Sequence, residues 1–418
     1  MIYKHRLAVK SRKTLEHSVL DFRSITKYAD NVGINEKEFL SVNAVEQKLN
    51  IKWAKNINGL FCPAEKLYFT CEDGFLYKQN ETDFVRIYNL DGEKIKFCLR
   101  LDGLKIKGDL FFTEKFCVLV DESGFGKTLN VPSCDTAEVY AGMLFTGKNH
   151  KINYSALLNA NDFSLGDLNG GYILLGRESG KIISLVKRKD VLIIFCERSV
   201  FELCAYGDSA DYNLKQIAVN PYNESINFAE LMSDQKILVK IGEKLYFFSD
   251  EKFSLADSFI NNGGYEIIGS PACDGANYFM PVKQIKKDYC GIFCRLSDKT
   301  ECVVSCDKPI VTKKGHLLRS GKVFKIEKGC SEDKYVWQSI PLDFGVIENK
   351  AILEVRSQTN GDVKLNISGQ RSNNVLMLKN GYDAKKLNAE GQSFVLTING
   401  KQSATLKDLK FKYVKKGE

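Results

Sequence analysis

The chain has 418 residues, 44% of them hydrophobic, which is enough for two or three domains with substantial cores. Its formal net charge of +8 permits contact with nucleic acid but does not argue for it. The first ten residues lack the apolar segment of a secretory signal, and the run VLIIFC at 191–196 is too short to span a bilayer, so we expect no membrane span. The 13 cysteines, an odd number, favour free thiols in a reducing compartment over a disulfide framework.

Residues 1–54 carry few strand patterns and are predicted to form an N-terminal arm or adaptor segment. The one helix candidate of the chain lies here, at 35–49 (NEKEFLSVNAVEQKL). Asn35 is placed to cap such a helix, Glu38 follows three residues later, and apolar residues from Phe39 to Leu49 fall on one rough stripe.

Residues 55–334 are predicted to form a β-propeller. Short β-branched or aromatic segments follow one another here, bounded by Gly, Asp or Asn, and almost nothing has helical periodicity. The stretch has room for six or seven units of about 40–45 residues, the size of a propeller blade. A large sandwich is the alternative. A turn ending in Gly, where a positive φ is expected, precedes an apolar pair at five places: 73–77, 91–95, 179–183, 242–247 and 320–324.

The segment CVLVDESGFGKTLN at 117–130 almost matches the phosphate-binding loop of nucleotide-hydrolysing enzymes. That motif requires Gly at the position that Asp121 occupies, and it requires a helix directly after Thr128. Pro132 prevents that helix from forming, because it pushes Val131 toward extended geometry. We therefore predict a hairpin or a loop between blades, without nucleotide binding.

Two close cysteine pairs, Cys290/Cys294 and Cys302/Cys306, raise the question of a zinc site. The segments 289–296 and 301–305 read as two strands around a turn. Residues four apart on one strand are separated by about 13 Å, and no histidine completes a ligand set. Buried small side chains are the favoured interpretation, and a metal site is the alternative.

Other catalytic patterns are missing from the sequence. The histidines do not have metalloprotease spacing, and there is no GxSxG elbow. Acid pairs such as Glu72/Asp73 and Asp121/Glu122 fall in turns, and the basic runs at 185–189, 284–288 and 413–418 are typical of solvated strand edges. The sequence thus predicts no catalytic, cofactor-binding or metal-binding residue, no cofactor, and no enzymatic activity.

Residues 335–418 change character. Their strand-like segments alternate strictly between polar and apolar residues, which is the pattern of sheets with one solvated face. A small C-terminal β-sandwich is predicted for this range. The fold class is therefore all-β, a propeller followed by a sandwich.

The stretch Lys151–Asn220 resembles the propeller core of phage tail and head-completion proteins, among them nozzle and packaged-DNA-stabilising proteins of short-tailed phages. The resemblance continues at the entry to the C-terminal region, where those proteins have a W-x-S/T-x-x-x-D-F-G phrase. Its motifs are structural, and Glu197 and Arg198 among them are expected to lock a hairpin turn as a charged pair. The matching residues are Asn153–Ser155, Asp162–Phe163, Gly170–Ile173, Gly180–Leu185, Leu192–Phe195, Glu197–Leu203, Trp337, Ser339, Asp343, Phe344 and Gly345.

The resemblance implies a non-enzymatic virion structural protein that assembles in a ring, docks tail or portal proteins and helps to seal or gate the DNA channel. It would be assembled in the host cytoplasm and reside in the virion tail, and non-specific contact with packaged DNA stays open. The alternative is a propeller that binds or cleaves glycans in host recognition, with acids, Arg and aromatic residues at its central mouth. A host-encoded interaction scaffold is a third hypothesis.

Overall fold

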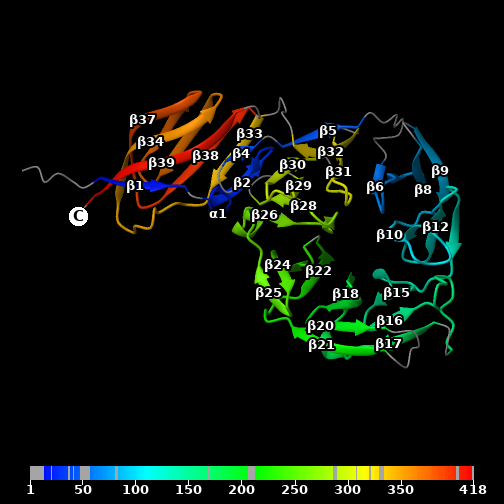
Figure 1. Cartoon of the computed structure of the whole chain (residues 1–418). Coiled ribbons are helices and arrows are strands. Elements are labelled where there is room, and N and C mark those ends of the chain that lie inside the picture. Colours follow the sequence, from blue (N-terminus) through cyan, green and yellow to red (C-terminus); the bar gives the residue numbers. More distant parts are fainter. Residues whose placement is uncertain are drawn as a thin grey trace, which may run out of the picture.

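The protein is built almost entirely of β-strands, arranged as a ring of small sheets with a two-sheet sandwich beside it (Figure 1). The predicted fold class, a β-propeller followed by a C-terminal sandwich, is confirmed. The computed structural model describes residues 14–19, 21–35, 38–40, 42–47, 57–80, 83–166, 170–205, 212–232, 234–285, 290–306, 308–319, 322–328, 334–401 and 404–416.

The first five blades are four-stranded antiparallel meanders whose strands pair in sequence order. Blade 1 consists of β6 (Ile57–Phe61), β7 (Tyr68–Cys71), β8 (Phe75–Asn80) and β9 (Asp83–Asn89). Blade 2 consists of β10 (Phe97–Leu101), β11 (Gly108–Phe112), β12 (Cys117–Asp121) and β13 (Gly126–Leu129). Blade 3 consists of β14 (Thr136–Tyr140), β15 (Met143–Lys148), β16 (Lys151–Tyr154) and β17 (Gly171–Leu174). Blade 4 consists of β18 (Ile182–Arg188), β19 (Val191–Cys196), β20 (Ser199–Cys204) and β21 (Asn213–Val219), and blade 5 of β22 (Ile226–Leu231), β23 (Ile237–Ile241), β24 (Lys244–Ser249) and β25 (Lys252–Leu255).

The last two blades use strands from the N-terminal region. Blade 6 consists of β26 (Tyr265–Ile267), β27 (Ala272–Cys273), β28 (Tyr278–Gln284), β29 (Cys290–Arg295) and β30 (Glu301–Ser305), with β3 (Gly33–Ile34) and β4 (Phe39–Leu40) added beyond β30. In blade 7, β31 (His316–Arg319) pairs β32 (Lys322–Lys328), and β5 (Val42–Glu46) completes the outer edge. Val311 forms an isolated antiparallel β-bridge with Leu317 and so occupies the innermost position of blade 7. The described residues thus form seven blades, and the ring is closed by a strand from the other end of the chain.

The recurring glycine turns adopt the backbone geometry that their sequence predicts. Gly74, Gly92, Gly180 and Gly242 have φ values of +80°, +83°, +76° and +55°. A Cβ is disfavoured there, so these positions favour glycine. Gly74 and Gly242 lie in the β7–β8 and β23–β24 hairpins, and Gly92 and Gly180 lie in connections between blades. The fifth glycine of the pattern, at 321, lies outside the described residues.

The helix predicted at 35–49 is wrong, because the described part of this segment forms β4 and β5 instead. The predicted capping contact does form, since the Glu38 amide donates to Asn35 Oδ1 at 2.9 Å, but no helix follows from it. Backbone pairing of β5 with β32 over five residues replaces the helical hydrogen bonds. Tertiary pairing has overridden a weak local helical pattern.

The C-terminal sandwich packs two sheets face to face. One sheet has the order β1-β39-β34-β37, and the other continues through β2-β33-β38-β35-β36. Side chains between them, such as Leu365, Leu396 and Phe411, are completely buried. The strands are β1 (Thr14–Ser18), β2 (Thr26–Asp30), β33 (Lys334–Ser339), β34 (Lys350–Asn360), β35 (Val363–Gly369), β36 (Asn373–Leu378), β37 (Gly381–Gly391), β38 (Phe394–Lys401) and β39 (Thr405–Lys415).

The N-terminal strands join the propeller to the sandwich. β2 pairs β30 of blade 6 on one side and β33 of the sandwich on the other, so one sheet runs through both parts. The short helices α1 (Phe22–Ile25) and η4 (Phe259–Asn262) pack beside this junction, while η2 (Arg177–Ser179) precedes blade 4. None of the described helices has the length and apolar content needed to cross a membrane. The domain boundaries at residues 54 and 334 stay predictions.

Candidate functional site in the central channel

The first strands of successive blades lie side by side around the propeller axis, where they enclose a small cavity. Neighbouring first strands such as β14, β18 and β22 pack against one another. The cavity has a volume of 310 Å³ and is lined by the inner strands of blades 1, 2, 6 and 7. The inner strands of many blades converge at this axis, so a ligand site of a propeller is expected there.

An ion pair bridges blades that are not neighbours in the ring. Lys313, which follows the innermost position of blade 7, contacts Glu230 on β22 of blade 5 through its ammonium group. The Glu230 carboxylate raises the pKa of Lys313 above its ordinary value, against the opposing effect of burial. Lys313 is therefore held in its charged form within the channel.

A second carboxyl group, Glu138 on β14, lies in the same region. Burial raises the pKa of Glu138, while the charges of Lys313 and Lys187 act in the opposite direction. The Val139 amide donates to its Oε1 at 2.9 Å, which holds the side chain in place. Glu138 accepts a proton more readily than an exposed glutamate, so it is the best candidate in this cluster for a general acid or base.

Two thiols complete the axial cluster, which we define as Glu138, Lys187, Glu230, Lys313, Cys98 and Cys273. Burial raises the pKa of Cys98 to about 12, and it also raises the pKa of Cys273. Thiols with raised pKa values are protonated at neutral pH and react slowly as nucleophiles. The cluster can bind a small polar molecule through Lys313 or move a proton at Glu138.

Within the described residues, no group of three or more His, Cys, Asp and Glu side chains could hold a metal ion. The residues that line the 310 Å³ cavity include Phe61 and Phe97 but neither Arg nor Tyr. The acids, Arg clamp and Tyr expected of a propeller glycosidase are therefore not assembled in this described lining.

The axial cluster is not evident from the sequence. Its members come from six blades, and Cys98 and Lys313 are separated by more than half of the chain. The only local signal is a charged residue on the inner strand of a blade, as Glu138 is in TAEVY and Glu230 in INFAEL. That signal is indistinguishable from an ordinary exposed position without knowledge of which strands line the channel.

The segment 117–130 forms the predicted hairpin, with β12 and β13 paired in antiparallel register. Asp121, which stands where a phosphate loop needs Gly, organises this turn. Its Oδ1 accepts hydrogen bonds from the Gly124 amide at 3.1 Å, from the Phe125 amide at 3.2 Å and from the Ser123 hydroxyl. These hydrogen bonds define an Asx-type turn. The turn geometry explains why this segment is rich in glycine, with no need for a bound nucleotide.

The cysteine pairs face each other across the β29–β30 hairpin. Cys294 and Cys302 are buried and opposite in register, with their Sγ atoms 2.9 Å apart. Cys290 and Cys306 are half-buried at the end of the same hairpin. The prediction of buried small side chains thus holds for the inner pair.

The predicted charged pair Glu197–Arg198 is wrong, because the structure forms no ion pair between these two described residues. The Glu197 carboxylate instead accepts from the Lys181 amide at 3.1 Å. Its carbonyl accepts from the Ile226 amide of blade 5 at 3.0 Å. Glu197 therefore connects the hairpin of blade 4 to the start of its own blade and to the next blade.

No protein-family model and no curated protein matches this chain. Among solved structures, virginiamycin B lyase from Staphylococcus aureus is similar at 11% identity, over 68% of this chain and 99% of that one, with a TM-score of 0.48. PorZ, a surface component of the type-IX secretion system of Porphyromonas gingivalis, is similar at 10% identity over 82% of this chain and 46% of its own, with a TM-score of 0.42. The Neurospora crassa Pan2 WD40 domain is similar at 10% identity over 65% and 88%, with a TM-score of 0.40.

Sequence identities this low indicate a similar fold and carry no information about function. They nevertheless correct one expectation from the sequence, that of a protein without enzymatic activity. The similar structures include an enzyme, virginiamycin B lyase, so a propeller of this kind is no argument against catalysis. The chain is an all-β protein with a propeller architecture.

Proposed function

We propose that this protein is a structural subunit of a phage-type virion, which assembles into a ring through exposed strand edges at its two ends. The proposal rests on the resemblance of Lys151–Asn220 to phage tail propellers together with the place of that segment in the fold. It forms the outer half of blade 3 and the whole of blade 4, from β16 to β21.

The observation that carries the proposal is an apolar edge on blade 3. β17 is the last strand of its sheet and has no partner on its outer side in the described residues. Leu165, Tyr172 and Leu174 beside or on this strand are exposed, Leu174 at 65%. An unpaired strand with exposed apolar side chains is a surface for another chain, because it offers both backbone hydrogen bonds and apolar contact.

A second edge of the same kind lies at the far end of the molecule. β36 is the last strand of its sandwich sheet, and its Val375 and Met377 are exposed, Met377 at 47%. Figure 1 places the blade 3 edge and the sandwich at opposite ends of the protein. Two different surfaces at opposite ends suit a head-to-tail contact between copies, which generates a ring if the rotation closes.

The ring, rather than the propeller, would surround the DNA in this mechanism. The axis of the propeller is narrow and is bridged by the Lys313–Glu230 ion pair. Rigid connection of sandwich and propeller through β2 would keep the two docking edges in a constant orientation. Tail or portal proteins would then dock on the faces of the assembled ring.

The test is the assembly state of the purified protein at increasing concentration, measured by mass photometry and negative-stain electron microscopy. We expect rings of one size for the native chain. Leu174→Lys on one edge and Met377→Lys on the other should each leave single subunits, because a lysine opposes burial of the edge. Ile347→Lys, at a loop position that is 85% exposed and outside both edges, is the matched control and should still form rings.

A native chain that stays monomeric at every concentration would contradict the proposal. So would edge variants that assemble like Ile347→Lys. Mixing of the native subunit with an isolated tail or portal ring then tests the virion partner, with co-sedimentation expected.

A further inference from the structure

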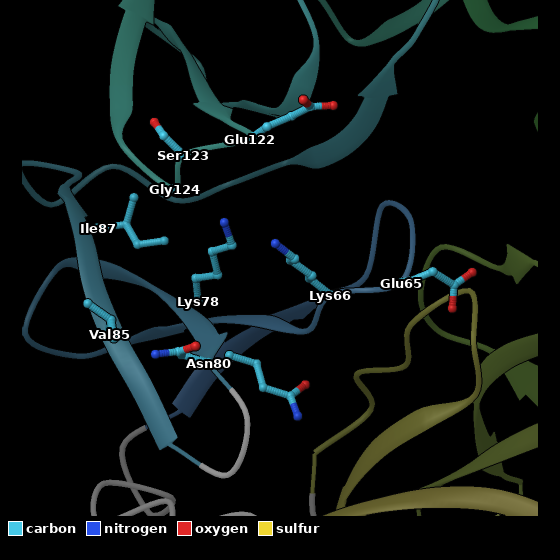
Figure 2. Close-up of a pocket in the computed structure, with 10 residues that line it drawn as sticks. Glu65, Lys66, Lys78, Asn80, Val85, Ile87, Glu122, Ser123 and Gly124 are labelled. Atoms are coloured by element: carbon cyan, nitrogen blue, oxygen red, sulfur yellow. The ribbon is translucent and has the colours of Figure 1, made fainter.

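A second cavity, of 520 Å³, lies between blades 1 and 2, away from the axial cluster (Figure 2). Its walls are the loop before β7, the end of β8, the middle of β9 and the turn between β12 and β13. That turn is the one that resembles a phosphate loop in sequence. An adjoining cavity of 360 Å³ extends the space toward Arg100 and Asp109.

Two lysines point into this cavity from different elements. Figure 2 shows the side chains of Lys66, from the loop, and Lys78, from β8, directed into the same space. Burial lowers the pKa of Lys78, and the neighbouring charge of Lys66 lowers it further. Neither lysine forms an ion pair with another described residue. Two like charges thus face the same opening without a counter-ion.

The carboxylates around the cavity are already engaged. Asp109 accepts from Tyr68 Oη at 2.7 Å and from Arg100 Nη1 at 3.2 Å, and Glu122 lies 3.6 Å from Arg100 Nη2. Asp121 is held by its own turn, and Glu65 pairs with Lys314 on the opposite side at 3.2 Å.

Asp109 and Asp121 act on Lys78 through space and oppose the lowering of its pKa, but neither forms an ion pair with Lys66 or Lys78. An anionic ligand would supply the missing negative charge.

The turn between β12 and β13 is shaped to approach Lys78. Gly124 has a φ of +91°, and a Cβ at this position would lie 3.2 Å from Lys78 Nζ. A glycine therefore leaves room for the ammonium group and for a ligand atom beside it. Asn80 adds an uncharged amide to the wall, while Val85 and Ile87 form an apolar side.

We propose that this cavity binds the phosphate group of a small phosphorylated molecule, between the ammonium groups of Lys66 and Lys78. A phosphate monoester carries close to two negative charges at neutral pH and so matches two lysines. A phosphodiester of nucleic acid carries one charge per phosphate and matches them less well. The remaining volume, beside Val85 and Ile87, would hold the organic part of the ligand.

Isothermal titration calorimetry with inorganic phosphate at constant ionic strength tests this site. We expect saturable binding to the full chain and at least a tenfold loss of affinity in Lys78→Gln and in Lys66→Gln, two variants on separate elements. Lys127→Gln, on β13 beside the same turn but outside the cavity lining, is the matched control and should bind like the native chain.

Three outcomes would overturn the proposal. One is a heat signal that does not saturate. The second is equal affinity in the native chain, in Lys66→Gln and in Lys78→Gln. The third is a single-stranded oligonucleotide that binds more tightly than phosphate and depends on the same two lysines, since the ligand would then be nucleic acid. A melting temperature of each variant without ligand shows that it is folded.

Discussion

Arg295 and Glu301 face each other across the β29–β30 hairpin, with Nη1 of the arginine 2.8 Å from Oε1 of the completely buried glutamate. The Phe259 amide donates to the other carboxylate oxygen at 2.9 Å. Nearby, Arg23 of α1 pairs with Asp257 at 2.9 Å. These two ion pairs join blade 6, η4 and the N-terminal helix at the junction with the sandwich. We therefore expect protonation of Glu301 to affect the stability of the whole chain.

Glu301→Gln should change how stability depends on pH. Burial raises the pKa of Glu301 to about 7, although Arg295 opposes the shift, so the folded state binds a proton more tightly than the unfolded chain. The resulting stabilisation is present below the ordinary pKa of 4.5 and is lost as the pH rises through 7. In the native chain the free energy of unfolding should fall by at most about 3 kcal/mol as the pH rises, and Glu301→Gln should not show this fall. Urea unfolding at pH 5 and pH 8 measures it.

Glu72→Gln, at an exposed turn position, is the control for the loss of a carboxyl group and should unfold with the native pH dependence. An unchanged pH dependence in Glu301→Gln would contradict the raised pKa.

His316→Gln should have the opposite effect, on the acid side. Burial lowers the pKa of His316 to about 4, and the charges of Lys325 and Lys314 add to this. The folded pKa lies below the ordinary value of 6.5, so the stabilisation is present above pH 6.5 and is lost as the pH falls through 4. Between pH 6.5 and pH 4 the free energy of unfolding should fall less in the variant than in the native chain. The difference should be at most about 3 kcal/mol. Urea unfolding measured at several pH values from 7 to 4 tests this, and equal losses of stability in the variant and the native chain would contradict the lowered pKa.

Trp337 and Thr26 should be energetically coupled across the junction. The Trp337 Nε1 group donates to Thr26 Oγ1 at 2.7 Å, and the indole is completely buried. We expect Trp337→Phe to destabilise the chain by about 1–3 kcal/mol, because the hydroxyl loses its donor and a cavity opens. A double-mutant cycle with Thr26→Val should give a coupling free energy of about 1 kcal/mol. Strict additivity would show that the hydrogen bond contributes nothing measurable.

Cys294 and Cys302 should form a disulfide when the protein is treated with diamide. Their Sγ atoms lie 2.9 Å apart and need to approach to about 2.05 Å, a small movement between strands that are already paired. Each thiol gives up one proton and one electron, and diamide is reduced to the hydrazine. Burial raises the pKa of Cys302, so the reaction should be slow at neutral pH and faster at alkaline pH.

Peptide mapping of the oxidised native chain should reveal a cross-link between the peptides that contain these two residues. Cys302→Ala should lack it and retain the Cys294 thiol. A native chain in which both thiols survive alkaline diamide treatment would refute the prediction.

The sequence by itself determined the local structure of this protein. Alternating apolar residues and glycine turns such as Gly74 and Gly242 specify hairpins over a few residues, so a run of four-stranded meanders was predictable. A phosphate loop could also be excluded from the local sequence. Asp121 replaces a required glycine, and Pro132 prevents the required helix.

Only the tertiary structure decided which distant residues meet. Strand β5 joins blade 7 because closing the ring leaves an outer edge that needs a backbone partner, which no local pattern encodes. Glu138, Glu230 and Lys313 come together because inner strands converge on one axis. The turn between β12 and β13 lies beside Lys78 because blade 2 packs against blade 1. Such contacts depend on packing between blades, and single charged residues on strands carry no sequence signal of it.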